Sequence, residues 1–151
     1  MIWLFALFLA GGLVFHSFIP QPSTPMVAAS PTLKPSLTSQ TILIEFNQYR
    51  QHRGLPTLQE DEALCELAKV RVEEVQTDWS HNGFYQRSQP FLSRHPYQRL
   101  GENLARAFDD PAQVIRAWDR SPEHQENLTY PYNRVCFAVS DDHIVQILGQ
   151  P

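Results

Sequence analysis

The chain has 151 residues, of which 42% are hydrophobic and 19% are charged, so it has room for one domain and the composition of a globular protein. Its formal net charge is -4, from 12 Lys and Arg against 16 Asp and Glu, and it contains no run of basic residues. No nucleic-acid partner is therefore expected, because phosphate binding needs a basic stripe that displaces counterions.

Residues 1–19 form an apolar segment that is interrupted only by His16 and Ser17 and contains no Asp, Glu, Lys or Arg. The segment is slightly shorter than the roughly 20 residues that span a hydrocarbon core, and longer than the roughly 7–15 apolar residues of a cleaved signal peptide. Its length favours a transmembrane anchor, whereas the small residues Val27-Ala28-Ala29 leave cleavage as a signal segment open. No cysteine follows the segment closely, so a lipid anchor is not indicated. We expect contact with a membrane through this N-terminal segment.

Residues 20–39 have the composition of a linker. Ser, Thr, Ala and Gln are common there, together with five prolines: Pro20, Pro22, Pro25, Pro31 and Pro35. Proline removes backbone donors and disfavours helix at the preceding residue, so this segment predicts an extended, solvated linker. The folded domain is expected to occupy residues 40–151.

Two amphipathic helices are predicted at the start of this domain. The first begins at Ser39 and ends at Gly54, with apolar residues spaced by three and four: Ile42, Phe46 and Tyr49. The second begins near Glu60, and its inner stripe comprises Leu64, Leu67, Ala68, Arg71 and Val75. An arginine on an apolar stripe is usually paired or snorkelling, so we expect a structural role for Arg71.

The rest of the chain changes character from irregular to helical and then to extended. Residues 79–100 lack a sustained period and are expected to be irregular. A short helix is predicted over 112–118 after the Asp110-Pro111 start signal, and Ser121-Pro122 repeats that signal. The apolar runs 134–139 and 143–148 flank a polar pair and predict a β-hairpin. Helices followed by strands indicate an α+β layered domain.

The two cysteines admit two interpretations. Cys65 lies in the second predicted helix and Cys136 in the first strand of the predicted hairpin. They form a disulfide if the domain matures in an oxidising compartment, or remain two small buried thiols.

Several motifs in order make the chain resemble the CAP superfamily, the SCP-like extracellular domain, in its compact bacterial-type branch. The motifs are Phe46-Asn47-Gln48-Tyr49-Arg50, Gly54-Leu55-Pro56, Ser80-His81, Gly101-Glu102-Asn103-Leu104-Ala105, Trp118, and Ser121-Pro122-Glu123-His124 with Asn127-Leu128. The resemblance covers residues 41–149. It implies an α-β-α sandwich with a small antiparallel sheet between helices, export from the cytoplasm, and a cleft where two histidines and one or two acids meet.

Carried over position by position, the family cluster falls on His81, Glu102 and His124. The larger family members have a second glutamate three residues after the tryptophan, where this chain has Ser121. From the residues alone, two imidazoles and a carboxylate suit either a partial divalent-metal site, for an ion such as zinc, or a hydrogen-bonded network. Asn103 is expected to cap a turn or a helix start.

The resemblance and the cluster together favour an exported ligand-binding or signalling module of the cell envelope or the extracellular space, rather than an enzyme. The expected partner is an unidentified ligand, such as a lipid or an envelope component. The alternative is a metal-assisted or serine-based hydrolase, in which His81 or His124 acts as base, Glu102 orients it, and Ser80 or Ser121 attacks. A third interpretation is an interaction domain in which the cluster is inert.

Overall fold

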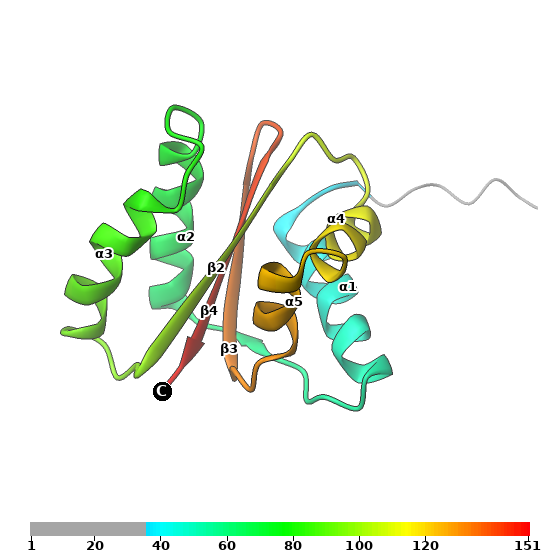
Figure 1. Ribbon diagram of the computed structural model, residues 1–151, viewed down its shortest axis with the longest axis horizontal. Helices are drawn as coiled ribbons and strands as arrows, with labels where there is room; N and C mark the ends of the chain where they lie inside the picture. Colours follow the sequence, from blue (N-terminus) through cyan, green and yellow to red (C-terminus); the bar gives the residue numbers. More distant parts are fainter. Residues whose placement is uncertain (1–35) are drawn as a thin grey trace, which may run out of the picture. The chain divides into compact units, whose positions relative to one another are not determined.

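The computed structural model describes residues 36–151. The predicted anchor or signal segment, 1–19, and most of the predicted linker lie outside these residues. Helices cover both faces of a central sheet in the described part of the chain (Figure 1). The helices and strands in chain order are α1 (Ser39–His52), β1 (Gln59–Glu60), α2 (Glu62–Glu74), α3 (Asn82–Leu92), β2 (Arg99–Arg106), α4 (Pro111–Asp119), α5 (Pro122–Thr129), β3 (Arg134–Ser140) and β4 (His143–Gln150). Within residues 36–151, no helix has both the length and the apolar character needed to cross a membrane.

Side-chain caps fix where the predicted helices begin. Thr38 precedes α1, and its hydroxyl accepts a hydrogen bond from the Thr41 amide at 3.1 Å while the Thr41 hydroxyl accepts one from the Thr38 amide at 2.9 Å. Asp61 and Asp110 cap α2 and α4 in the same way with their carboxylates, and Pro111 occupies the first turn of α4. These caps satisfy amide groups that have no partner inside the helix.

The prediction that residues 79–100 are irregular is wrong, because half of this segment is α3 and the segment ends in the start of β2. α3 escapes a search for helical periodicity because it buries a single side chain, Phe84, and contains Pro90 in its interior. Asn103 likewise lies within β2 and caps no helix.

The sheet has the strand order β1-β3-β4-β2. β3 and β4 form the predicted hairpin around Asp141 and Asp142, and β2 pairs antiparallel with β4, so that Glu102 lies opposite Ile147. The short β1 adds a parallel pair with β3, so the sheet is mixed and not wholly antiparallel as expected. The fold class, an α+β domain built as an α-β-α sandwich, is confirmed.

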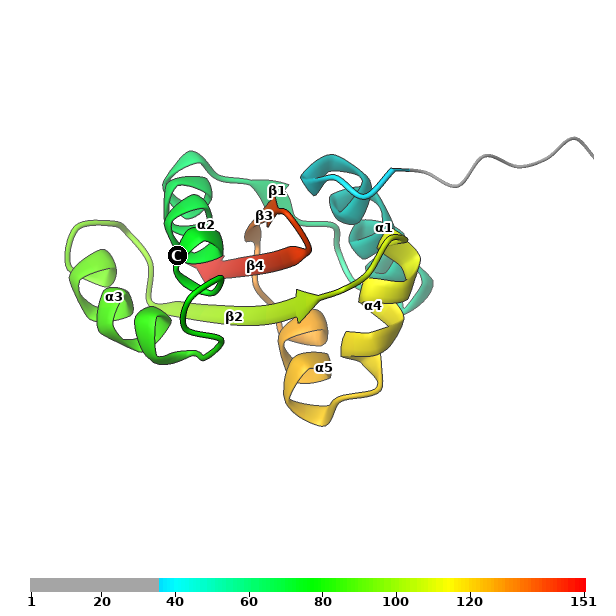
Figure 2. The same ribbon diagram turned by 90° about the horizontal axis from the view of Figure 1, so that it is seen from above.

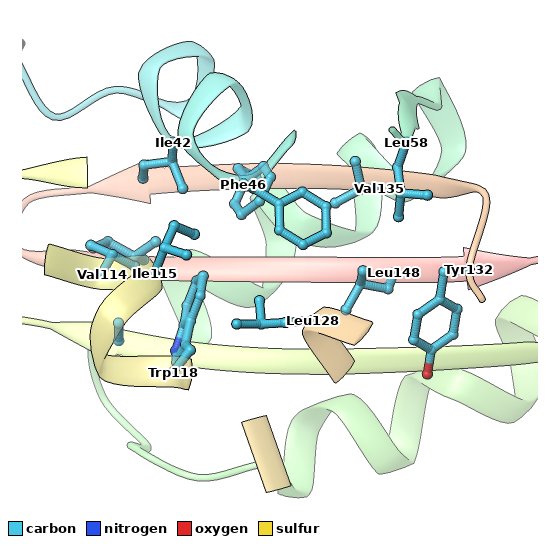
Figure 3. Close-up of a cluster of buried hydrophobic side chains, with 13 residues drawn as sticks. Ile42, Phe46, Leu58, Val114, Ile115, Trp118, Leu128, Tyr132, Val135 and Leu148 are labelled. Atoms are coloured by element: carbon cyan, nitrogen blue, oxygen red, sulfur yellow. The ribbon is translucent and has the colours of Figure 1, made fainter. Parts of the chain in front are cut away.

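Each face of the sheet has its own hydrophobic core, because alternate strand residues point to opposite faces. On β3, Val135 and Phe137 join the core formed with α1, α4 and α5, whereas Cys136 and Ala138 join the core formed with α2 and α3. Figure 3 shows the first of these cores, in which Trp118 is almost fully buried. The views along two axes agree that α2 and α3 lie on one side of the sheet and α1, α4 and α5 on the other (Figures 1 and 2).

A disulfide joins Cys65 of α2 to Cys136 of β3, with an S–S distance of 2.01 Å. The two cysteines are therefore bonded to each other in the structure and are not two free buried thiols. The bond ties a helix layer to the sheet across 71 residues of sequence.

Candidate functional site

The candidate site lies along β2, the last strand in the order of the sheet. Two side chains cover the outer edge of this strand: Asn127 donates to the Glu102 carbonyl at 3.1 Å, and the Trp118 indole donates to the Leu104 carbonyl at 2.9 Å. Because an open strand edge can pair with another chain, these bonds close the edge to further strand addition at these carbonyls. They also place α5 directly beside β2.

Glu102 points toward α2, where Arg71 binds its carboxylate with two hydrogen bonds. Arg71 Nε donates to Glu102 Oε2 at 2.7 Å and Arg71 Nη2 donates to Oε1 at 3.2 Å, and both side chains are only 1% exposed. Arg71 also donates to Glu74 Oε2 at 2.7 Å and to the Ser80 carbonyl at 2.9 Å. Burial alone would lower the pKa of Arg71, but its bonds to Glu102 and Glu74 outweigh this and raise it. Arg71 therefore neutralises the buried acid of the candidate site.

His81 lies at the N-terminal end of α3 and contacts the same carboxylate. Its Nδ1 is 2.8 Å from Glu102 Oε1, and its side chain is 39% exposed. Because a carboxylate that already accepts bonds from Arg71 can only accept, Nδ1 is the donor in this bond. In the neutral ring, Nε2 then carries the lone pair. Glu102 therefore sets both the orientation and the tautomer of His81.

Two glycines allow the layers to approach this closely. A Cβ on Gly83, in the first turn of α3, would lie 2.7 Å from Glu74 Oε2 and would also collide with the Arg71 guanidinium. A Cβ on Gly101 would lie 2.6 Å from the Tyr132 hydroxyl. Real Cβ atoms do not make such contacts, so a larger residue at 83 would displace the Arg71 and Glu74 side chains, and one at 101 would displace the Tyr132 and Asn127 side chains.

His124 belongs to α5, on the face of the sheet opposite to that of α3. Burial lowers the pKa of His124, the charge of His81 lowers it further, and Glu123 opposes both effects by raising it. The direction of the shift keeps the imidazole neutral to lower pH than a free histidine, with a lone pair available.

A cleft of about 440 Å³ brings these groups together at the edge of β2. The structure places all three residues of the sequence-predicted cluster on its surface, with α3 forming one wall and α5 the other. The cleft is lined by His81, Phe84, Tyr85, Arg99, Leu100, Gly101, Glu102, Glu123, His124, Asn127 and Tyr132. A smaller space of about 160 Å³ also contacts both histidines and is lined by Trp79, Ser80, His81, Leu104 and His124.

An amide network fixes α5 against the back of β2. Asn103 donates to Gln146 Oε1 at 2.8 Å and to the His124 carbonyl at 3.2 Å, and Asn127 donates to Asn103 Oδ1 at 2.9 Å. Asn103 and Gln146 are fully buried. The hydrogen bond from Asn103 thus holds the backbone of His124 against β2, the strand that also carries Glu102.

A divalent metal fits the two imidazoles better than it fits the carboxylate. Both oxygens of Glu102 already accept hydrogen bonds, and the Arg71 guanidinium beside them repels a cation. A carboxylate bonded to Nδ1 is a common partner of a histidine that ligates metal through Nε2. Of the predicted cluster, the two imidazoles are thus the groups that could donate a lone pair to an ion such as zinc, with Glu102 orienting His81.

Within residues 36–151, one group of three His, Cys, Asp or Glu side chains has all its ligand atoms within 4.8 Å of one another, namely Glu60, Cys65 and Cys136, so the ligand atoms of His81, Glu102 and His124 do not converge that closely. The disulfide occupies both sulfur atoms of this group, so in the oxidised protein it offers only a carboxylate.

Several residues of the site were not predicted from the sequence as part of it. Arg71 was expected to be a paired structural residue, and its position on an apolar helix stripe was a signal that a buried acid would face it. Tyr85, Arg99 and Tyr132 line the cleft but carried no local signal in the sequence.

The described chain is an α-β-α sandwich with the strand order β1-β3-β4-β2 between its helix layers. A family model described as "CAP: Cysteine-rich secretory protein family" matches residues 43–143. The chain belongs to this family.

Relatives and solved structures agree with this assignment. The chain is 30% identical over 93 residues to the uncharacterized protein YkwD of Bacillus subtilis, a match that covers 56% of this chain and 35% of that protein. A cysteine-rich secretory protein from Staphylococcus aureus has a TM-score of 0.68 at 21% identity, covering 75% of this chain and 38% of its own.

Two further structures share the fold. An extracellular protein with an SCP domain from Bacillus anthracis has a TM-score of 0.67 at 22% identity, covering 75% of this chain and 40% of its own. An outer surface protein from Borrelia burgdorferi has a TM-score of 0.65 at 20% identity, covering 78% of this chain and 98% of its own. The chain thus spans well under half the length of YkwD and of the first two structures, and nearly all of the fourth protein.

Proposed function

We propose that this domain is a binding module on the exported side of a membrane, and that it holds its ligand in the cleft between α3 and α5 without changing it covalently. The family is named for secretory proteins, and proteins of the same fold are described as extracellular or as outer surface proteins. The apolar segment 1–19 is suited to direct the chain there, as an anchor or as a cleaved signal.

The observation that carries this proposal is the shared cleft itself. His81 comes from one helix layer and His124 from the other, and both line the same space above a buried acid that is fully engaged. A site whose polar groups are fixed before a ligand arrives is suited to recognition, because little side-chain freedom is lost on binding.

The alternative of a serine-based hydrolase finds no support in the hydrogen bonds of the cleft. Ser80 Oγ accepts from the Asn82 amide at 3.2 Å. Among the described residues, no serine hydroxyl is hydrogen-bonded to either imidazole of the cleft. A nucleophile needs a base within hydrogen-bond reach, so the geometry favours binding over acyl transfer.

The location is tested by fusing a phosphatase reporter, active only after export, to the end of the full chain. We expect an active reporter with the whole chain and an inactive one when residues 2–19 are deleted. An inactive reporter on the whole chain would contradict export.

The cleft is tested by thermal melts of the wild type, H81A and H124A with three probes: zinc chloride, phosphatidylglycerol vesicles and N-acetylglucosamine oligomers. At least one probe should stabilise the wild type, stabilise both variants less, and be recovered unaltered by mass spectrometry. A probe that is recovered cleaved would show an enzyme. Equal stabilisation of all three proteins would show that the cleft is not the binding site.

A further inference from the structure

The exposed aromatic side chains of the described chain are not scattered. Four large hydrophobic side chains are exposed in residues 36–151, namely Ile44, Val70, Trp79 and Tyr85. The two aromatic ones are 40% and 66% exposed and stand two residues before and four residues after His81. Single exposed apolar side chains are normal, whereas exposed ones that gather at one place mark a ligand or partner site.

Both rings lie along one groove. Tyr85 lines the larger space at the edge of β2, Trp79 lines the smaller one, and these two spaces share His81 and His124. The groove is the pair of spaces taken together, with Tyr85 in the lining of one, Trp79 in the lining of the other and the two imidazoles in the lining of both. The Tyr85 ring centroid lies 6.4 Å from that of His81.

Neighbouring side chains hold the Trp79 ring in place. The Arg106 guanidinium lies 4.8 Å from its ring centroid, and His143 packs against it edge-to-face at 5.6 Å. Such contacts fix the ring orientation before a ligand binds, which reduces the entropy lost on binding.

The larger of the two spaces, which Tyr85 lines, also has a polar lining. Arg99 donates only and Glu123 accepts only, whereas Asn127 already donates to the Glu102 carbonyl and to Asn103 Oδ1, and the Tyr132 hydroxyl is bonded to Asn127 Oδ1. A ligand that matches this lining needs both donors and acceptors, as hydroxyl and amide groups provide. It also needs flat apolar faces for the rings.

These features together select one class of ligand. An acyl chain would place hydrocarbon over Glu123 and Arg99 and leave their charged groups without water. A strongly anionic ligand would pair with Arg99 but would also be repelled by Glu123 of the same lining. A sugar ring has hydroxyl groups around its rim and an apolar C–H face, which matches a polar groove flanked by aromatic rings.

We propose that the groove binds an oligosaccharide, with sugar rings stacked on Trp79 and Tyr85 and the intervening hydroxyl groups bonded to the polar lining. This inference rests on the proposed binding function of the same cleft and names its ligand class.

The test is isothermal titration of the purified domain with three neutral tetrasaccharides: β-1,4-linked N-acetylglucosamine, β-1,4-linked glucose and α-1,4-linked glucose. At least one should bind the wild type, and both W79A and Y85A should bind it about tenfold or more weakly, the usual loss for a central aromatic contact. Y85F keeps the ring and should retain affinity. The matched control I44A removes an exposed apolar side chain on α1 and should change affinity by about twofold at most.

The outcomes separate this inference from the binding function on which it rests. If no tetrasaccharide binds, or if W79A and Y85A bind as the wild type does, the sugar-binding inference is wrong. In that event, stabilisation by zinc or by vesicles that is lost in H81A and H124A would leave the binding module standing. If neither sugars nor those probes act through the histidines, both proposals are wrong. Folding of each variant is checked by circular dichroism, and Y85F shows whether the loss in Y85A comes from the ring.

Discussion

Removing Arg71 should strongly destabilise the domain, because it leaves the Glu102 carboxylate buried without its cationic partner. In the structure both side chains are 1% exposed, and Arg71 supplies two of the hydrogen bonds that the carboxylate accepts. Breaking a buried pair by removing one partner typically costs about 3–5 kcal/mol, so we expect R71M to lose that much free energy of unfolding. Against a total stability of about 5–15 kcal/mol for a typical domain, this loss is large.

The assay is urea unfolding followed by far-UV circular dichroism, with two comparisons. K69M removes an exposed ion pair with Glu66 on the same helix and should cost about 0.5 kcal/mol or less. The double variant R71M/E102Q removes the buried charge as well, so it should be more stable than R71M alone. The reasoning is refuted if R71M costs no more than K69M, or if adding E102Q to R71M lowers the stability further.

Three further predictions concern the disulfide, an acid at the junction of three helices, and zinc. Replacing Cys65 and Cys136 with serine opens a link that closes a loop across 71 residues, so calorimetry should show a loss of about 4 kcal/mol, whereas an unchanged melting curve would exclude a stabilising role. The hydrogen bond from the Tyr49 hydroxyl, together with bonds from Gln125 and Arg53, lowers the pKa of Asp119. The ionised Asp119 should therefore stabilise the fold above the ordinary Asp pKa of about 3.9, and this stabilisation should be lost as pH falls through the lowered pKa. The wild type should therefore exceed D119N in stability at neutral pH, with the gap closing in acid; a gap independent of pH would contradict this assignment. Zinc should raise the melting temperature of the wild type at neutral pH and should not raise that of H124A. The shift in the wild type should be smaller in acid, because an imidazole must be neutral to bind a metal. Equal shifts in both proteins would exclude His124 as a ligand.

The sequence predicted the elements whose core contacts repeat with a regular period. α1, α2 and the hairpin of β3 and β4 bury residues at such spacings. α3 was missed because a helix that buries only Phe84 has no apolar period to detect. β2 was missed as a strand because two of its buried residues, Glu102 and Asn103, are polar and obtain their partners from α2, α5 and β4.

The candidate site was predicted by resemblance and not by spacing, since His81, Glu102 and His124 are too far apart in sequence for any local pattern to join them. The role of Arg71 needed the structure, because its partner is 31 residues away. The disulfide was undecided for a similar reason: the two sulfur atoms meet only because α2 packs on β3.

Few buried side chains hold α3 to the rest of the domain, so residues on this helix can change at a small cost in stability. Phe84 is its one buried residue, while His81 at its start and Tyr85 on its surface both line the cleft. Of the α3 residues only Phe84 and Tyr85 line the cleft, and Tyr85 is exposed, so a substitution at Tyr85 changes the chemistry of one cleft wall without removing a buried core residue. Binding and stability then depend on different residues at this wall. A library restricted to position 85 should yield variants that fold as the parent does and differ in what they bind.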